Sequence, residues 1–236
     1  MKITVINGNT RHGSTWHCMD LFRRELEKYE EIQLKEISLP KDMPHHCVGC
    51  FSCFYKGEQA CPHYEAVHPI ITALEEADLI IMTSPVYAFD VSGGLKALLD
   101  HLSYMWLSHR PNPAMFQKVA LTITTTAGAG LSHTTKTMKQ SLSFWGVKKV
   151  YTYKKAVAAM KWEDVTPKKK AEIEKAIAGK AKKIYRTVHN RNKIPYPLFG
   201  KFMFNIMKGM QKSNNWNPTD RKHWESQGWL EGSKPY

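Results

Sequence analysis

The loop from Gly8 to Thr15 carries residues that could bind an anion. Its sequence, GNTRHGST, follows the apolar run Ile3–Ile6 and comes directly before a segment with helical periodicity. In a strand, loop and helix of this kind, the first backbone N–H groups of the helix point at the loop with the positive end of the dipole behind them. Ser14 or Thr15 is the expected N-cap. The sequence therefore predicts an anion site at this loop.

A monophosphate suits this loop better than a nucleotide triphosphate does. A P-loop has lysine directly after its second glycine, and the residue at that position here is Ser14. The dinucleotide fingerprint G-x-G-x-x-G is also missing from the sequence. A monophosphate needs only hydroxyl groups, N–H groups and a cation. These groups are available at Asn9, Thr10, Arg11, Ser14 and Thr15.

Four of the five cysteines are close together and could hold a metal or a cluster. They are Cys47, Cys50, Cys53 and Cys61, in the pattern C-x2-C-x2-C-x7-C. Four thiolates at such spacing can bind a [4Fe-4S] cluster, whereas zinc sites more often have two separated C-x-x-C pairs. A loop of free thiols is the third alternative. Histidines flank the segment at His45, His46, His63 and His68. They are expected to be separate and solvated, with a mixed ligand set as the alternative, while Cys18 is expected in the core.

An alternation of strands and helices positions these residues. Strands are expected at 3–6, 32–37, 79–85, 118–124 and 147–153, with helical periodicity between them and after the last. This alternation predicts an α/β protein with a parallel sheet, right-handed connections and helices on both faces. An anion loop after the first strand favours the doubly wound order 2-1-3-4-5, with ligands at the carboxyl ends of the strands.

Two further loops are expected to converge on the first at that edge of the sheet. The second contains Pro85, Val86, Tyr87 and Ala88, and the third contains Thr125, Thr126, Ala127 and Gly128. The second would form a flat, partly apolar wall, and the third would supply hydroxyl and N–H donors from the opposite side. Small residues in both allow the backbone to approach a ligand closely. A planar conjugated ring with a phosphate tail fits such a cleft.

Three stretches, GNTRHGST, SPVYAFDVSGGLKALLDH and TTTAGAG, occur in this order along the chain. Together they resemble the NAD(P)H-dependent FMN reductase family of flavodoxin-like proteins, and the resemblance extends to about residue 190. It implies FMN, with its phosphate at the first loop and its ring between the other two. It also implies NAD(P)H as electron donor, a small acceptor (a quinone, a nitro or azo compound, or flavin) and a homodimer. Tyr87 is expected to touch the substrate, and Lys96 and Asp100 are expected to be structural.

The cysteine spacing resembles the compact motif of iron-sulfur flavoproteins, a branch of the same superfamily. The resemblance implies a [4Fe-4S] cluster on Cys47, Cys50, Cys53 and Cys61, close to FMN. It also implies an alternative function, that of an electron carrier that docks onto a protein partner. Similar flavin reductases carry C-x-G-C-x-x-C without a cluster, so the alternative of free thiols stays open.

The net charge of +13 is concentrated in one region of the chain. Fifteen basic residues lie between Lys148 and Lys193. The solvated face of one long helix, beginning at Thr166–Pro167, accounts for them. The sequence has no zinc-finger or RNP-type pattern, which makes nucleic-acid binding a minor alternative.

A C-terminal extension, 191–236, is expected to follow an FMN-binding domain, 1–190. Residues 196–212 form an amphipathic basic helix, expected to dock on the body or a second subunit, with a membrane surface as the alternative. Residues 216–236 are aromatic and without period, and could cover a site. The sequence has no apolar run of about 18 residues and no signal-peptide pattern at its start. We therefore expect a cytoplasmic protein, in which disulfides are rare.

Overall fold

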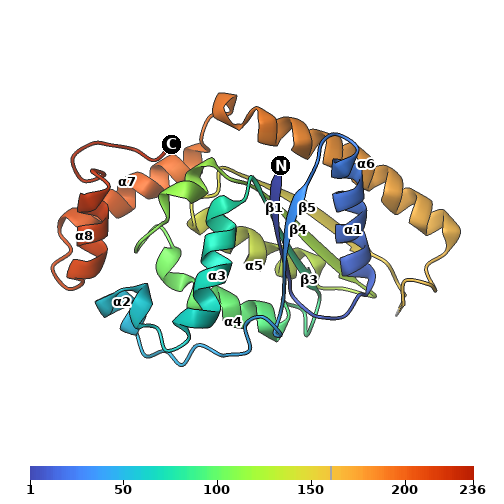
Figure 1. Ribbon diagram of the computed structural model, residues 1–236, viewed down its shortest axis with the longest axis horizontal. Coiled ribbons are helices and arrows are strands. Elements are labelled where there is room, and N and C mark those ends of the chain that lie inside the picture. The colour runs from blue at the N-terminus through green and yellow to red at the C-terminus, as the bar shows by residue number, and fades with distance from the viewer. Residues whose placement is uncertain (160) are drawn as a thin grey trace.

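A five-stranded parallel sheet forms the centre of the computed structural model, which describes residues 1–159 and 161–236. The strands are β1 (Lys2–Asn7), β2 (Gln33–Ser38), β3 (Leu79–Pro85), β4 (Val119–Thr126) and β5 (Lys149–Ala156). Their order in the sheet is β2-β1-β3-β4-β5, which confirms the predicted doubly wound topology (Figure 1). The order reverses direction between β1 and β3, where ligands bind in such sheets.

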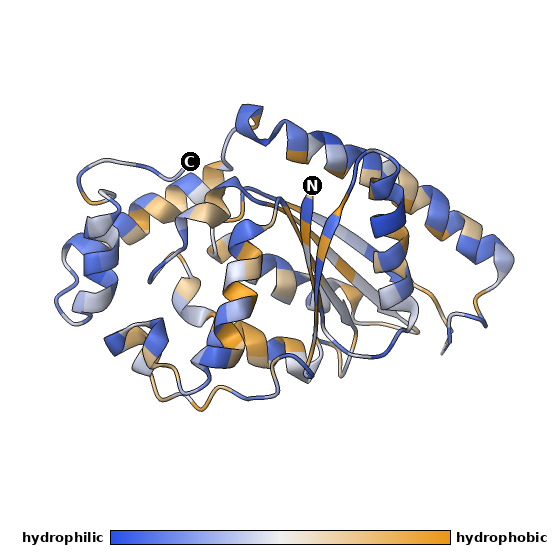
Figure 2. Cartoon of the chain, viewed as in Figure 1, coloured by the Kyte–Doolittle hydropathy of each residue, from blue (hydrophilic) through white to orange (hydrophobic). Residues whose placement is uncertain are grey.

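Helices cover both faces of the sheet. The principal ones are α1 (Ser14–Glu27), α3 (Tyr64–Glu76), α4 (Gly93–His101), α5 (Leu131–Phe144) and α6 (Pro167–His189). Residues of α1 and α6 share one hydrophobic cluster with the sheet, and those of α3, α4 and α5 share the other. The apolar run of β3 is continuous because Leu79 and Ile81 face the first cluster while Ile80 and Met82 face the second. Figure 2 shows the hydrophobic residues concentrated on α3 and α4, which cover one face of the sheet.

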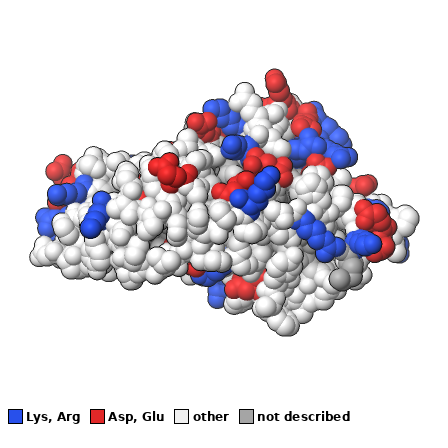
Figure 3. All heavy atoms as spheres, turned by 60° about the horizontal axis from the view of Figure 1, so that its bottom comes forward, with Lys and Arg blue, Asp and Glu red and all other residues white. Residues whose placement is uncertain are grey.

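Eight of the fifteen basic residues between Lys148 and Lys193 lie on α6, and the other seven lie before or after it. Its N-cap is Thr166, which accepts a hydrogen bond from the backbone of Lys169, and Pro167 is its first residue, as predicted. Ile173, Ile177 and other apolar residues of the helix are buried against the α1 side of the sheet, so its lysines lie on the outer face. On the molecular face of Figure 3, basic and acidic residues lie side by side.

The beginning of α1 differs from the prediction. Its N-cap is Gly13, and Ser14 and Thr15 lie inside the first turn. No side chain of the described residues caps this end. The first N–H groups of the helix are therefore left without the partner that a capping serine or threonine would supply.

The extension contains a short 3-10 helix, Arg191–Lys193, and two α-helices, α7 (Leu198–Lys212) and α8 (Pro218–Ser226). Residues 216–236 have no apolar period in the sequence, yet α8 forms within them. This helix has Asn217 as its cap and Pro218 as its first residue, but only Trp224 supplies a buried aromatic, so no apolar repeat marks it. Together with Leu107 and Phe116, the extension forms a third hydrophobic cluster. In the described part of the chain, no helix is long and apolar enough to cross a membrane.

Candidate functional site

The three predicted loops meet at the carboxyl edge of the sheet. The hydroxyl groups of Thr15 and Thr125 lie 2.6 Å apart and are buried, which joins the first turn of α1 to the end of β4. The side-chain amide of Asn9 donates a hydrogen bond to the Tyr87 hydroxyl over 3.0 Å. The first loop is thus connected to both others by side chains that the sequence singled out.

Gly8 holds the first loop close to the sheet. Its N–H donates to the Thr83 carbonyl at 2.8 Å, and its carbonyl accepts a hydrogen bond from the Ser92 hydroxyl. A Cβ atom at this position would lie 2.6 Å from the Thr83 oxygen and 2.8 Å from the Ser92 Oγ. Only glycine allows this approach. Because Ser92 is also the N-cap of α4, the same contact fixes the beginning of α4.

The second loop turns tightly and presents Tyr87. The backbones of Tyr87 and Asp90 form both hydrogen bonds of an antiparallel bridge, each 2.9 Å long. Between them, Ala88 and Phe89 have φ values of 47° and 66°, in the left-handed region that such a turn needs at both central positions. Non-glycine residues there cost roughly 1–2 kcal/mol each. Strain of this kind persists where the surroundings impose it, which favours a functional role for the loop.

A cavity of about 220 Å³ lies between the loops. Its lining includes Asn9, Arg11, Ser14, Thr15, Pro85, Val86, Tyr87, Thr125, Thr126 and Ala127. Thr10, Ala88 and Gly128, also predicted, lie on the same loops but outside this lining. Gly13, Val157 and Ala159 complete it and were missed by sequence reasoning. Val157 and Ala159 follow β5, whose carboxyl end reaches the same edge of the sheet.

The chemistry of the cavity fits a ligand with a phosphate and a flat ring. The first turn of α1 offers N–H donors, the hydroxyls of Ser14 and Thr15, and no acidic residue. Arg11 lines the same cavity and supplies a positive charge. The wall from Pro85 to Tyr87 is mostly apolar. A phosphate would fit the polar, positively charged part of the cavity at the beginning of α1, and a flat ring would fit the apolar part along the wall.

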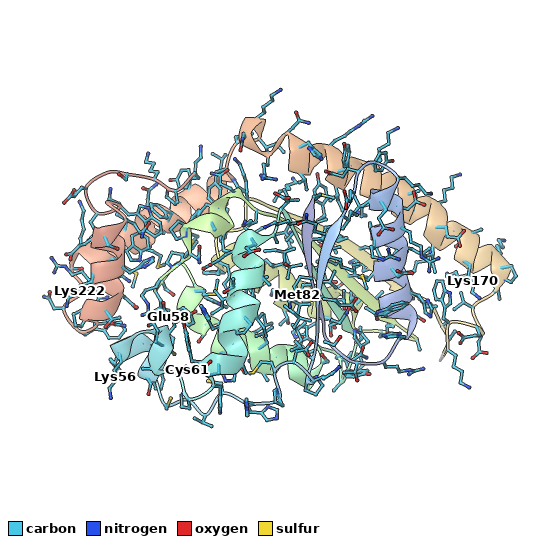
Figure 4. All side chains as sticks on the ribbon, in the orientation of Figure 1. Lys56, Glu58, Cys61, Met82, Lys170 and Lys222 are labelled. Carbon is cyan, nitrogen blue, oxygen red and sulfur yellow. The ribbon has the colours of Figure 1, made fainter. Side chains whose placement is uncertain are left out.

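The four clustered cysteines line a second cavity, of about 280 Å³. Cys47 and Cys50 are exposed, whereas Cys53 and Cys61 are half-buried. Burial raises the pKa of the Cys53 thiol to about 11. The short helix α2 (Ser52–Lys56) carries Cys53, and Figure 4 shows Cys61 between this helix and the beginning of α3. Cys18 lies elsewhere, in the core as predicted, and burial raises its pKa to about 12.

His63 is neither separate nor fully solvated, contrary to expectation. His63 Nδ1 lies 2.9 Å from His101 Nε2, and His101 is buried. His45 stacks on His63 with ring centroids 4.4 Å apart. α4 begins at the edge of the sheet where the three loops meet, and its last residue, His101, lies at the cysteine cavity. His109 Nδ1 lies 2.7 Å from Asp220 Oδ2 of α8.

The extension is tied to the cysteine segment. Arg110, which is buried, donates to Asp220 at 2.5 Å and to the backbone carbonyl of Cys53. The Thr219 hydroxyl donates to the Tyr55 carbonyl at 2.8 Å. Thus α8 lies against α2 rather than over the loops at the carboxyl edge of the sheet. Lys96 and Asp100, expected to be structural, form an exposed ion pair one turn apart on α4.

A doubly wound parallel sheet with an uncapped helix end and an apolar wall at the switch point defines the class of flavodoxin-like α/β proteins. Within that class, the chain belongs to the family of NADPH-dependent FMN reductases, whose model matches residues 1–163. The match includes the three loops and the cysteine segment.

Individual relatives differ in the activities that their names state. An iron-sulfur flavoprotein of Archaeoglobus fulgidus is 27% identical over 149 residues, which are 62% of this chain and 64% of that protein. An NADPH azoreductase of a Bacillus species is 30% identical over 148 residues, 61% of this chain and 69% of that protein. The matched part of this chain spans between 48% and 64% of the length of three iron-sulfur flavoproteins to which it is similar.

Solved structures share the fold. An FMN-dependent NADH-azoreductase from Bacillus anthracis, solved in complex with FMN, has a TM-score of 0.58 and 14% sequence identity to this chain. The similarity covers 77% of this chain and 100% of the azoreductase. At this identity, the likeness extends to the fold alone.

Proposed function

We propose that this protein is an FMN-dependent oxidoreductase that passes electrons from NAD(P)H to a small acceptor, a quinone, a nitro or azo compound, or flavin. The observation that carries the proposal is the cavity where the uncapped beginning of α1 meets the Tyr87 wall and the Thr125 loop. Membership of the FMN reductase family supports the same conclusion.

Each loop has a distinct task in this proposal. Arg11, Ser14, Thr15 and the N–H groups of the first turn of α1 bind the phosphate, with Asn9 and Thr10 beside them. Residues 85–88 and 125–128 bind and orient the ring. When bound, FMN supplies the redox chemistry, taking a hydride from the donor and passing electrons to the acceptor. Tyr87, 48% exposed at the mouth, contacts the substrate.

Steady-state kinetics with the FMN-loaded protein test the proposal. Because donor and acceptor use one cleft in turn, initial rates should give the parallel double-reciprocal plots of a ping-pong mechanism. Tyr87→Phe keeps the ring but removes the hydroxyl bonded to Asn9, and Tyr87→Ala removes both. We expect Tyr87→Ala to raise KM for the acceptor about tenfold, a loss of about 1.4 kcal/mol. Absence of NADH and NADPH oxidation with every acceptor class would refute the proposal.

A second candidate function is electron carriage by an iron-sulfur flavoprotein that docks onto a protein partner. The observation favouring it is that Cys47, Cys50, Cys53 and Cys61 line one cavity. Anaerobic purification followed by iron and acid-labile sulfide analysis tests it. Four iron and four sulfide per chain, as a [4Fe-4S] cluster requires, together with slow turnover of small acceptors, would favour this function.

The outer face of α7 is the surface that this proposal assigns to assembly. Leu198, Phe199, Phe202, Ile206 and Met210 are exposed on it, while Phe204 packs inward. We propose that residues 191–236 are an extension of an FMN-binding domain, 1–190, in a homodimer that uses this face. Light scattering of Phe202→Glu would then report a monomer. Binding of the unaltered chain to anionic vesicles, lost in Phe202→Glu, would favour membrane contact through 196–212 instead.

A further inference from the structure

The cysteine cavity contains a compact group of potential metal ligands that includes histidine. One ligand atom from each of Cys61, His63 and His101 lies within 4.8 Å of the other two. Cys61 and His63 come from the segment before α3, and His101 is the last residue of α4. From the bond lengths of zinc sites, tetrahedral ligand atoms are about 3.3–3.6 Å apart. Shifts of about 1 Å would therefore bring the three atoms to one ion.

The hydrogen bonds of His101 orient it for this role. Its Nδ1 lies 2.8 Å from the carbonyl oxygen of Ala97, which can only accept, so Nδ1 carries the proton. In the neutral ring, Nε2 therefore presents its lone pair toward His63 Nδ1, 2.9 Å away. A histidine whose second nitrogen donates to a backbone carbonyl is the usual arrangement of metal-bound imidazole. A metal ion would replace the hydrogen bond between the histidines, and His63 would change tautomer, with its proton on Nε2 instead of Nδ1.

We propose that Cys61, His63 and His101 bind a single zinc ion, with Cys53 as the fourth ligand. Thiolate and imidazole together favour zinc over magnesium or calcium, which prefer oxygen ligands. Cys53 is half-buried in the same cavity, whereas Cys47 and Cys50 are exposed. The ion would displace the thiol protons and connect α2, the segment before α3 and the end of α4.

The zinc site and a [4Fe-4S] cluster exclude each other because both need Cys61. They differ in the other residues required. A cluster on four thiolates has Cys47 as a ligand and does not involve His63. The zinc site has His63 as a ligand and does not involve Cys47. Residues at the FMN cavity belong to neither set, so flavin content reports on the proposed function separately.

Zinc binding to the full chain and its variants tests the proposal. The protein is stripped with chelator under reducing conditions, and zinc alone is added back in competition with a chromophoric indicator. His63→Ala and Cys61→Ser should each weaken zinc binding at least about tenfold. Cys47→Ser and His68→Ala, which change a nearby thiol and a nearby imidazole outside the set, should leave it unchanged. FMN content and circular dichroism of each variant show that it is folded.

Cobalt gives a second readout of the ligands. Substituted into the site, it should show a thiolate charge-transfer band that is lost in Cys61→Ser and kept in Cys47→Ser. Stoichiometric zinc with this pattern of variants supports the proposal. Equal zinc affinity in unaltered protein, His63→Ala and Cys61→Ser overturns it. So does an iron-sulfur cluster that survives in His63→Ala and disappears in Cys47→Ser, and that result supports the second candidate function.

Discussion

The hydroxyl groups of Thr15 and Thr125 form a buried contact of 2.6 Å across 110 positions of sequence. One belongs to the first turn of α1 and the other to the end of β4, so the contact sets the distance between the beginning of α1 and the third loop. Each hydroxyl satisfies the other. Removing one leaves a buried polar group without its partner, which costs more than the bond itself contributes.

Thr125→Val should therefore lower both stability and FMN affinity. We expect a loss of about 1–3 kcal/mol in the free energy of unfolding and a rise of about tenfold in the FMN dissociation constant. Denaturant titration and quenching of flavin fluorescence measure the two. The double variant Thr15→Val/Thr125→Val should lose less than the sum of the single variants. Strictly additive losses would show that the two hydroxyls act independently.

Ser14→Glu should affect phosphate binding and helix stability in opposite directions. A carboxylate in the first turn of α1 interacts favourably with the helix dipole and should stabilise the protein by about 0.3–1 kcal/mol. It also places negative charge where the phosphate is proposed to bind, so FMN affinity should fall by at least about tenfold. Lys168→Glu, in the first turn of α6, is the matched control and should stabilise without affecting FMN. If Ser14→Glu leaves the FMN affinity unchanged, the phosphate does not bind at the beginning of α1.

Gly8→Ala should disrupt the first loop. The added Cβ would meet the Thr83 carbonyl oxygen at 2.6 Å, and backbone must move to relieve the contact. A destabilisation of about 1–3 kcal/mol is expected, with reduced FMN content in the purified protein. Gly179→Ala, in α6, is the control, because a Cβ atom added there would have no described neighbouring atom within 4 Å. That variant should gain about 0.5–1 kcal/mol. Thermal unfolding of both variants in parallel distinguishes the steric clash at Gly8 from the effect that a glycine-to-alanine change has in itself.

Asp220→Asn should weaken the connection between α8 and the cysteine segment. Asp220 is fully buried and accepts from both Arg110 and His109. Loss of its charge leaves the buried Arg110 guanidinium with only the more distant Glu58 carboxylate, at 3.4 Å, as counter-ion, which costs up to about 3–5 kcal/mol. Limited proteolysis should then cut near α2 and α8 while FMN is retained. Protection equal to that of the unaltered chain would mean that Asp220 does not anchor this region.

Sequence reasoning succeeded where periodicity and topology determine the structure. The strand order followed from the alternation of strands and helices and from the loop after β1, and the three loops then had to share one edge. Val157 and Ala159 were missed because the segment after β5 has no glycine or hydroxyl signature. The position of His101 depends on the length and direction of α4, which a linear motif does not report.

Capping and tertiary contacts account for the remaining differences. Gly13 replaced the expected serine or threonine cap, which is what leaves the N–H groups of α1 available. α8 is stabilised by Asn217, Pro218 and the buried pair of Asp220 and Arg110 rather than by an apolar repeat. Contacts between residues more than 100 positions apart determine that helix, and they are visible only in the folded chain.

Flavin retention tests the central claim most directly. The full chain is saturated with FMN, separated from free flavin, and its visible spectrum is recorded anaerobically before and after addition of NADPH or NADH. The account predicts stoichiometric FMN whose absorbance is bleached by at least one donor and restored by a quinone or azo compound. A chain that retains no FMN, and that oxidises neither donor when FMN is supplied, would contradict it.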